Sequence, residues 1–234
     1  MKARFLLALA LLAPAFAPVA RAAERAILIS VDGMHALDLA LWVKNHPDSA
    51  FAQLARRGVT YTNARTPLLG DSTPGLVSLA TGATPATAGL IYSPFFDRTL
   101  VPAGAPAGTK GAVYYLDEKW VLNNLREDSG GGIDEKKLPR DPARGGAAVY
   151  PRHLLRVNTM FEVVKSAGGR TAWIDQHILY NDLLNGPSGR GLDDSAALER
   201  KGTTPDFAGY SGQDARRVEL LLNQVRGLDS SGKT

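Results

Sequence analysis

The chain has 234 residues, 44% of them apolar, which is enough for a sizeable hydrophobic core in one domain. It has no cysteine, which excludes disulfides, thiolate nucleophiles and thiolate metal sites, so any metal must be held by His, Asp, Glu or hydroxyl oxygen. Its 27 Lys and Arg are balanced by 23 Asp and Glu, and no basic run is interleaved with aromatic residues, so we expect no nucleic-acid-binding surface.

The first residues have the pattern of a secretory signal peptide. Lys2 and Arg4 precede an apolar run, and the small-x-small motif Ala-Arg-Ala follows at 20–22. The apolar run is too short for a spanning helix, although a retained membrane anchor is the alternative. We therefore expect residues 1–22 to be removed on export to the periplasm or the medium, and residues 23–234 to form the mature domain.

An alternation of strand and helix patterns predicts an α/β domain with a sheet of mostly parallel strands flanked by helices. The first strand is expected over Ala26–Val31, an apolar, β-branched run that stops at Asp32 and Gly33. Such a run is typical of a buried strand covered on both faces. Ligands gather at the carboxyl ends of these strands, so Asp32 is a candidate site residue, although Asp-Gly also simply makes a turn.

The remaining elements are predicted from periodicity and punctuation. In chain order they are a helix over 37–57 with Leu41, Val43, Phe51, Leu54 and Ala55 as core candidates, a strand over 58–64, a helix over 74–81, an irregular excursion over about 97–151 with ordered pieces at 113–116 and 120–125, a helix over 154–167, a strand over 170–174, and a helix over 213–225. No apolar strand follows the last helix, so we expect a C-terminally truncated domain.

The stretch "GDSTPGLVSLATG", Gly70 to Gly82, admits two interpretations. Thr73 as N-cap, Pro74 at the first helical position and the final glycine would make a well-capped helix and nothing more. The same geometry places the Ser72 hydroxyl at a positive helix terminus that stabilises an oxyanion or phosphate. Because no histidine is near in sequence, activation of this serine by a metal ion is the natural route to a nucleophile.

Two blocks, "AILISVDGMH" and "GVTYTNARTPLLGDSTPGLVSLATGATPATAGLI", resemble the N-terminal half of the alkaline phosphatase superfamily, and within it the type I phosphodiesterase/nucleotide pyrophosphatase group. The group's strand-end zinc-binding Asp falls on Asp32 and its nucleophile on Ser72, with Thr81-Gly82 ending the helix. The later blocks "VYPRHLLRVNTMFEVVKSAGGRTAWIDQH" and "LLNGPSGRGLDD" resemble exported bacterial members.

The resemblance implies an alkaline-phosphatase-like fold and a site with two zinc ions, at which Asp32 and Ser72 are ligands and the Ser72 hydroxyl attacks phosphorus. Small phosphoric esters would be the substrates, with diesters or pyrophosphates favoured over monoesters. The context Ser72-Thr73-Pro74-Gly75-Leu76 has Leu where a sulfatase needs Arg, which counts against sulfate esters.

The sequence departs from the family's pattern at several places. Ala88 replaces a motif His, and Ser93 takes the position of an Asn that binds a phosphate oxygen. The family draws most of its other zinc ligands from its C-terminal half, and zinc needs about four ligands. Asp175 and His177, near a strand end, are candidates for ligand or substrate contacts, or for an ordinary polar strand terminus. The alternative to a hydrolase is therefore a truncated, inactive domain that at most binds a metal or ligand.

Overall fold

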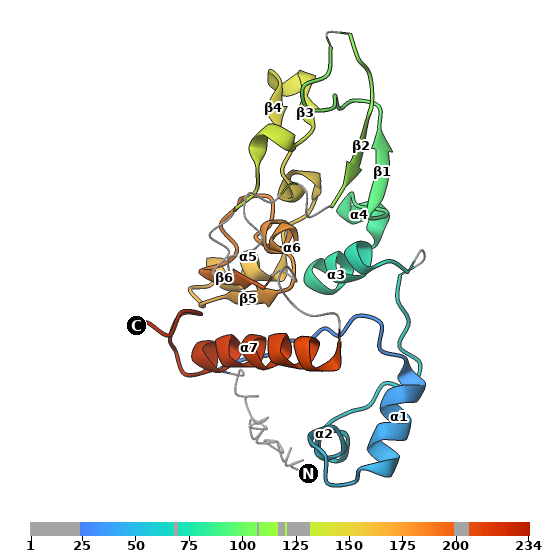
Figure 1. The fold of residues 1–234 in the computed structure, drawn as a ribbon, viewed down its shortest axis with the longest axis vertical. Helices are drawn as coiled ribbons and strands as arrows, with labels where there is room; N and C mark the ends of the chain where they lie inside the picture. Colours follow the sequence, from blue (N-terminus) through green and yellow to red (C-terminus); the bar gives the residue numbers. More distant parts are fainter. Residues whose placement is uncertain (1–23, 68–69, 107, 117–119, 121–131, 199–205) are drawn as a thin grey trace, which may run out of the picture.

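Figure 1 shows the computed structural model of the chain, which describes residues 24–67, 70–106, 108–116, 120, 132–198 and 206–234. The helices are α1 (Ala36–Asn45), α2 (Ala50–Arg57), α3 (Ser72–Thr81), α4 (Pro85–Ala88), α5 (Met160–Ser166), α6 (Ile178–Leu184) and α7 (Phe207–Val225), with short 3-10 helices η2 (Glu135–Lys137), η3 (Pro142–Arg144) and η4 (Pro151–Leu154). The strands are β1 (Pro94–Asp97), β2 (Ala112–Tyr115), β3 (Arg140–Asp141), β4 (Ala147–Ala148), β5 (Ala172–Asp175) and β6 (Asp194–Ala197).

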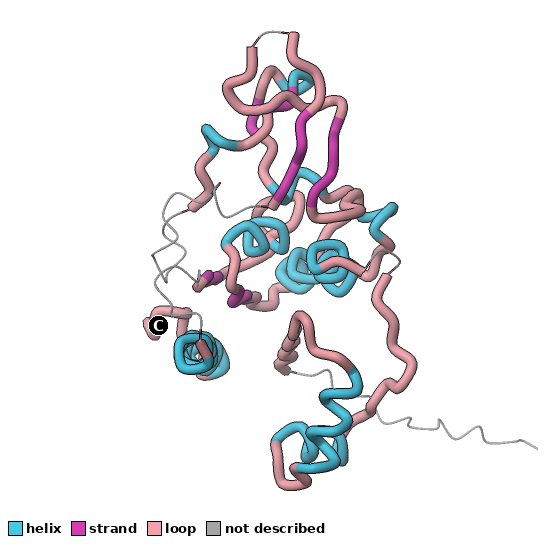
Figure 2. Tube along the Cα trace, turned by 45° about the vertical axis from the view of Figure 1, so that its right-hand side comes forward, coloured by secondary structure: helices cyan, strands magenta, loops and turns pink. Residues whose placement is uncertain are grey.

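The elements form three tiers along the long axis (Figures 1 and 2). The β1–β2 hairpin and the β3–β4 pair lie at one end, α3, α5, α6 and the β5–β6 pair lie in the middle, and the α1–α2 pair lies at the other end beyond α7. Helix and strand are therefore mixed, as predicted. The strands of the described residues pair only two by two, so the expected sheet of mostly parallel strands is not formed there.

The strand predicted to end at Asp175 is confirmed as β5, which pairs in parallel with β6. Ala172 lies opposite Asp194, and Asp175 lies opposite Ala197. Parallel strands need a long crossover, and α6 supplies a helix within it. On the other side of this pair, Leu220 of α7 packs with Ala196, Leu198 and Ile174.

The prediction of a buried strand at 26–31 is wrong in this structure. The segment is extended but unpaired, and Ile27, Ile29 and Val31 are more than half exposed. A strand needs hydrogen-bonding neighbours, and none of the described strands lies beside this segment in a ladder. The prediction of a strand at 58–64 is also wrong, because those residues form a loop and a turn.

The predicted helix over 37–57 is divided into α1 and α2. His46 and Pro47 interrupt it, since the residue before a proline disfavours helical backbone angles, and Ser49 caps the second helix by accepting a hydrogen bond from the Ala52 N–H. Gly58 ends α2 as predicted. The predicted core residues of this pair are wrong apart from the partly buried Val43; Leu41, Phe51, Leu54 and Ala55 are exposed.

The segment over 97–151, expected to be an irregular excursion, contains short strands and 3-10 helices and contributes most of one hydrophobic cluster. Tyr114 on β2 is fully buried, stacks on Phe95, and meets Trp120 edge-on. Leu138 and Val149 belong to the same cluster, which also includes Leu179 of α6. The ordered piece expected at 113–116 is largely β2; of the piece expected at 120–125, only Trp120 lies within the described residues.

The helix predicted over 154–167 begins later, at Met160. Thr159 and Glu162 form a capping box: each side chain accepts a hydrogen bond from the other's backbone N–H, which fixes the start of α5. The last helix begins earlier than predicted, at Phe207, because the Asp206 side chain caps it by accepting from the Gly209 N–H. The predicted signal peptide lies outside the described residues. Among the described helices, none is long and apolar enough to cross a membrane.

Candidate active site

The structure brings together Asp32 and Ser72, which are 40 residues apart in sequence. The Ser72 hydroxyl donates a hydrogen bond of 2.9 Å to Asp32 Oδ2. Asp32 lies in the turn before α1, where Gly33 adopts a positive φ of 71°, and Ser72 is the first residue of α3. Both side chains are exposed, so a ligand can reach the pair.

Helix α3 begins two residues earlier than the sequence suggested. Its N-cap residue is Asp71, not Thr73, and Ser72 is therefore inside the first turn. The first N–H groups of a helix have no partner within it, so this end carries partial positive charge next to the serine hydroxyl. The Asp71 carboxylate does not cap the helix; its Oδ2 accepts a 2.7 Å bond from the Ser93 backbone N–H. Gly82 ends the helix in the left-handed conformation, as predicted.

Ser93 is brought to the same place as Ser72. It precedes β1, and its Oγ lies 2.6 Å from the Oγ1 of Thr73, the neighbour of Ser72. Thr73 is fully buried, and its Oγ1 also lies 3.3 Å from the hydroxyl of Tyr180 on α6. Three hydroxyls from three distant segments therefore converge beneath the start of α3.

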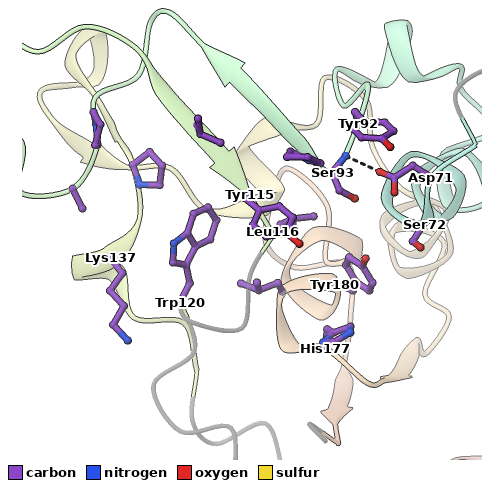
Figure 3. Close-up of a pocket in the computed structure, with 16 residues that line it drawn as sticks. Asp71, Ser72, Tyr92, Ser93, Tyr115, Leu116, Trp120, Lys137, His177 and Tyr180 are labelled. Carbon is purple, nitrogen blue, oxygen red and sulfur yellow. Dashed lines mark hydrogen bonds between the residues drawn. The ribbon is translucent and has the colours of Figure 1, made fainter.

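A cavity of about 770 Å³ opens beside this helix start (Figure 3). Ser72, Asp71, Ser93, His177 and Tyr180 lie at one end of it, and Trp120 and Lys137 lie at the other. The remaining lining residues are largely apolar or aromatic: Tyr92, Pro94, Pro102, Ala103, Val113, Tyr115, Leu116, Pro139 and Leu179. A cavity that combines apolar and aromatic walls with a few convergent polar groups is the usual form of a small-molecule site.

Of the predicted pair at the end of β5, His177 lines the cavity and Asp175 does not. Asp175 accepts hydrogen bonds from the Trp173 indole N–H at 2.7 Å and from the backbone N–H groups of Gln176 and His177. Asp175 therefore stabilises the turn into α6, as an ordinary polar residue at a strand terminus does. The chain turns after Asp175, so of the two candidates only His177 reaches the cavity. His177 meets the Tyr180 ring edge-on.

Sequence reasoning missed Tyr180 and Asp71 as residues of this cavity. Burial raises the pKa of the Tyr180 phenol above its ordinary value, the Thr73 hydrogen bond acts the other way, and the carboxylates Asp175, Asp71 and Asp32 raise it further. The phenol therefore stays protonated at neutral pH. Asp71 was visible beside Ser72 in the motif, whereas nothing near Tyr180 in sequence connects it to a segment 107 residues away.

Asp32 Oδ2 and Ser72 Oγ present two oxygen ligands to a cation. Within the described ranges, no group of three or more His, Cys, Asp or Glu side chains is arranged to hold a metal. Zinc needs about four ligands, so the described residues fit one side of a single zinc site and do not complete two.

The fold and this site define a mixed α/β protein with a serine at a helix start, paired with a carboxylate beside a cavity. A family model, type I phosphodiesterase / nucleotide pyrophosphatase, matches residues 26–127, less than half of the chain. The match spans Asp32, Ser72 and Ser93 and confirms the resemblance to this family of the alkaline phosphatase superfamily over the N-terminal part. At the level of the family it supports a hydrolase of phosphodiesterase or pyrophosphatase type, acting on small phosphoesters. No curated protein and no solved structure gave a significant match to the chain.

Proposed function

We propose that the protein is an exported, zinc-dependent hydrolase of phosphoric esters, with Ser72 as its nucleophile and diesters or pyrophosphates preferred over monoesters. The observation that carries the proposal is the 2.9 Å bond from the Ser72 hydroxyl to Asp32 Oδ2 at the start of α3. A hydroxyl that is both exposed and bonded to a carboxylate is held in one direction while its oxygen remains open to substrate.

In this proposal, the Ser72 Oγ forms a bond to phosphorus in line with the leaving oxygen, whose bond to phosphorus breaks. The intermediate is a phosphoric ester of Ser72. Water then hydrolyses it to the free Ser72 hydroxyl and a phosphate monoester. The N–H groups at the start of α3 face the charge that develops on the phosphoryl oxygens. Asp32 orients the hydroxyl and accepts its proton, which then passes to the leaving oxygen.

The charge of the site supports a requirement for a cation. Three carboxylates, Asp32, Asp71 and Asp175, act on the phenol of Tyr180 at the end of the cavity where Ser72 lies. An anionic phosphoric ester would be repelled by them unless a cation offset their charge. Zinc held by Asp32 and Ser72 would supply that charge and lower the pKa of the serine hydroxyl.

The test is hydrolysis of bis(p-nitrophenyl) phosphate by the purified chain in zinc buffer, with p-nitrophenyl phosphate as the monoester comparison. We expect Ser72→Ala to lower kcat by about a thousandfold or more without unfolding the chain. Ser78→Ala is the matched control on the same helix: among the described residues its buried hydroxyl has no hydrogen-bond partner, so its loss leaves turnover unchanged.

The opposite result is equally specific. If Ser72→Ala turns over at the wild-type rate, the nucleophile assignment is wrong. If the folded wild type hydrolyses neither ester yet binds zinc in a titration, the alternative of an inactive metal-binding domain replaces the hydrolase. The incomplete ligand set among the described residues is the observation that favours this alternative.

A further inference from the structure

The walls of the cavity include two hydroxyls that are connected beneath its surface. Ser93 and Tyr180 both line the cavity, whereas Thr73, which lies between them, is fully buried. Thr73 Oγ1 lies 2.6 Å from Ser93 Oγ and 3.3 Å from Tyr180 OH. A continuous row of three hydroxyls therefore starts and ends at the cavity and passes through Thr73, the residue next to Ser72.

Counting hydrogens shows what this row can offer to a ligand. Each hydroxyl has one hydrogen. Within the described part of the chain, the Thr73 hydroxyl bonds to Ser93 and Tyr180 and to no other group. Thr73 therefore donates to one neighbour and accepts from the other. The neighbour that donates to Thr73 offers only lone pairs to the cavity, whereas the other keeps its hydrogen for a ligand.

The chemistry of the two end groups sets the direction of the row. A phenol donates more strongly and accepts more weakly than an aliphatic hydroxyl, because the ring withdraws electron density from its oxygen. Burial also raises the pKa of the Tyr180 phenol, which keeps its hydrogen in place. Tyr180 is therefore the donor to Thr73, Thr73 donates to Ser93, and the Ser93 hydrogen is left for the cavity.

The position of Ser93 is fixed independently of this row. Its backbone N–H donates a 2.7 Å hydrogen bond to Asp71 Oδ2, and Asp71 directly precedes Ser72 (Figure 3). The Ser93 side chain is thus anchored on one side through its backbone and on the other through Thr73. Its remaining hydrogen is directed away from Thr73 and is available to a ligand, as the stabilisation of a developing oxyanion requires.

We propose that Tyr180, acting through Thr73, is a positioning residue that orients the Ser93 hydroxyl as a hydrogen-bond donor to an oxygen of the phosphoryl group that Ser72 attacks. The inference rests on the proposed function. It also explains how Ser93, with one hydroxyl hydrogen, can stand where the family has an Asn with two amide hydrogens. The Tyr180–Thr73 row leaves that one hydrogen for the ligand.

The test uses orthovanadate, an oxyanion that needs no turnover, titrated calorimetrically into the zinc-loaded chain and its variants. Thr73→Val removes the buried hydroxyl while keeping the side-chain shape, and Thr73→Ser keeps the hydroxyl. Tyr180→Phe removes the donor at the end of the row. Tyr114→Phe is the matched control, since its fully buried hydroxyl donates to the Val149 carbonyl, outside the cavity.

We expect Thr73→Val and Tyr180→Phe to weaken vanadate binding about tenfold, in line with the loss of one net hydrogen bond. We expect them to lower kcat for the aryl diester by a similar factor, with KM and zinc affinity unchanged. Thr73→Ser and Tyr114→Phe should bind vanadate as the wild type does.

Three results would overturn the inference: wild-type vanadate affinity in Thr73→Val, a loss in Thr73→Ser as large as that in Thr73→Val, or no vanadate binding by the folded wild type. The proposed function fails separately. If the wild type does not hydrolyse esters, yet the variants lose vanadate affinity in the expected order, the proposed hydrolase activity is refuted. The inference that Ser93 is an oriented donor is then retained.

Discussion

Ser72 and Asp32 are hydrogen-bonded across 40 residues of sequence, with the serine hydroxyl donating to the carboxylate at 2.9 Å. Neither residue is buried. A surface pair of this kind contributes little to folding, so its value lies in the orientation that it gives the hydroxyl. This separation of orientation from stability makes the pair accessible to substitution without unfolding the chain.

The first prediction concerns the two residues as a unit. Asp32→Asn keeps an oxygen that accepts the Ser72 hydrogen but removes the negative charge. We expect Asp32→Asn, Ser72→Ala and the double variant each to lower kcat by about a thousandfold or more, because members of one catalytic unit are not additive. Steady-state hydrolysis of an aryl phosphodiester measures this. If the loss in the double variant equals the product of the single losses, the two residues act separately.

The second prediction concerns Gly75 inside α3 and Gly82 at its end. Gly82 has a φ of 68°, which strains any residue with a Cβ, whereas Gly75 lies inside α3 with open space around its Cα. We expect Gly82→Ala to lower the free energy of unfolding by about 1 kcal/mol. Gly75→Ala should raise it by about 0.5–1 kcal/mol, since alanine is the better helix former. Urea unfolding decides, and equal effects of the two changes would contradict the assignment of Gly82 as the helix end.

The third prediction concerns the contact between α6 and α3. Leu183 is fully buried in a cluster with Val77, Leu90 and Leu155, whereas Leu79 on α3 is more than half exposed. We expect Leu183→Ala to cost about 2–5 kcal/mol of unfolding free energy. Leu79→Ala should cost well under 1 kcal/mol, as is usual for surface positions. Chemical denaturation monitored by far-UV circular dichroism measures both, and similar costs would show that α6 does not pack as described.

The fourth prediction concerns pH. Burial lowers the pKa of His153, and the neighbouring Arg152 and Arg144 lower it further, while Asp182 acts in the opposite direction. The unfolded chain therefore takes up a proton at His153 before the folded chain does. The unfolding free energy should fall as the pH drops below about 6.5, the ordinary pKa of histidine, and His153 should contribute no slope above it.

The measurement for His153 is a series of urea unfolding midpoints between neutral pH and mildly acidic pH. The Tyr150 N–H donates to His153 Nδ1 at 3.2 Å, so His153→Gln retains an acceptor without the titration. We expect the variant to lose part of the acid destabilisation seen in the wild type. Parallel curves for the two proteins would contradict a lowered pKa of His153.

Local sequence signals predicted the elements that depend on local chemistry. The Asp-Ser-Thr-Pro start and Thr-Gly end located α3 to within a few residues, and the Asp after "RTAWI" located the end of β5. The pairing of Asp32 with Ser72 followed from the family pattern. The ends of α3 and β5 depend on caps, turns and short motifs, which are encoded within a few residues of where they act.

Features that depend on neighbours in space could not be predicted in the same way. The run at 26–31 has the composition of a buried strand, but it gains ladder hydrogen bonds only from strands beside it. Tyr180 entered the site through the packing of α6 on α3, which no local spacing reveals. Asp175 and His177 diverged because the chain turns between β5 and α6.

The exposed run at 26–31 has one consequence for the behaviour of the protein in solution. It combines high β propensity with no charge and no proline, which is the composition of segments that pair edge to edge between molecules. Charged residues flank it on both sides, Glu24 and Arg25 before it and Asp32 after it. Asp32 therefore has the position that gatekeeper charges take beside such segments. Neutralising this charge in Asp32→Asn should favour aggregation, whereas Ser72→Ala keeps the charge.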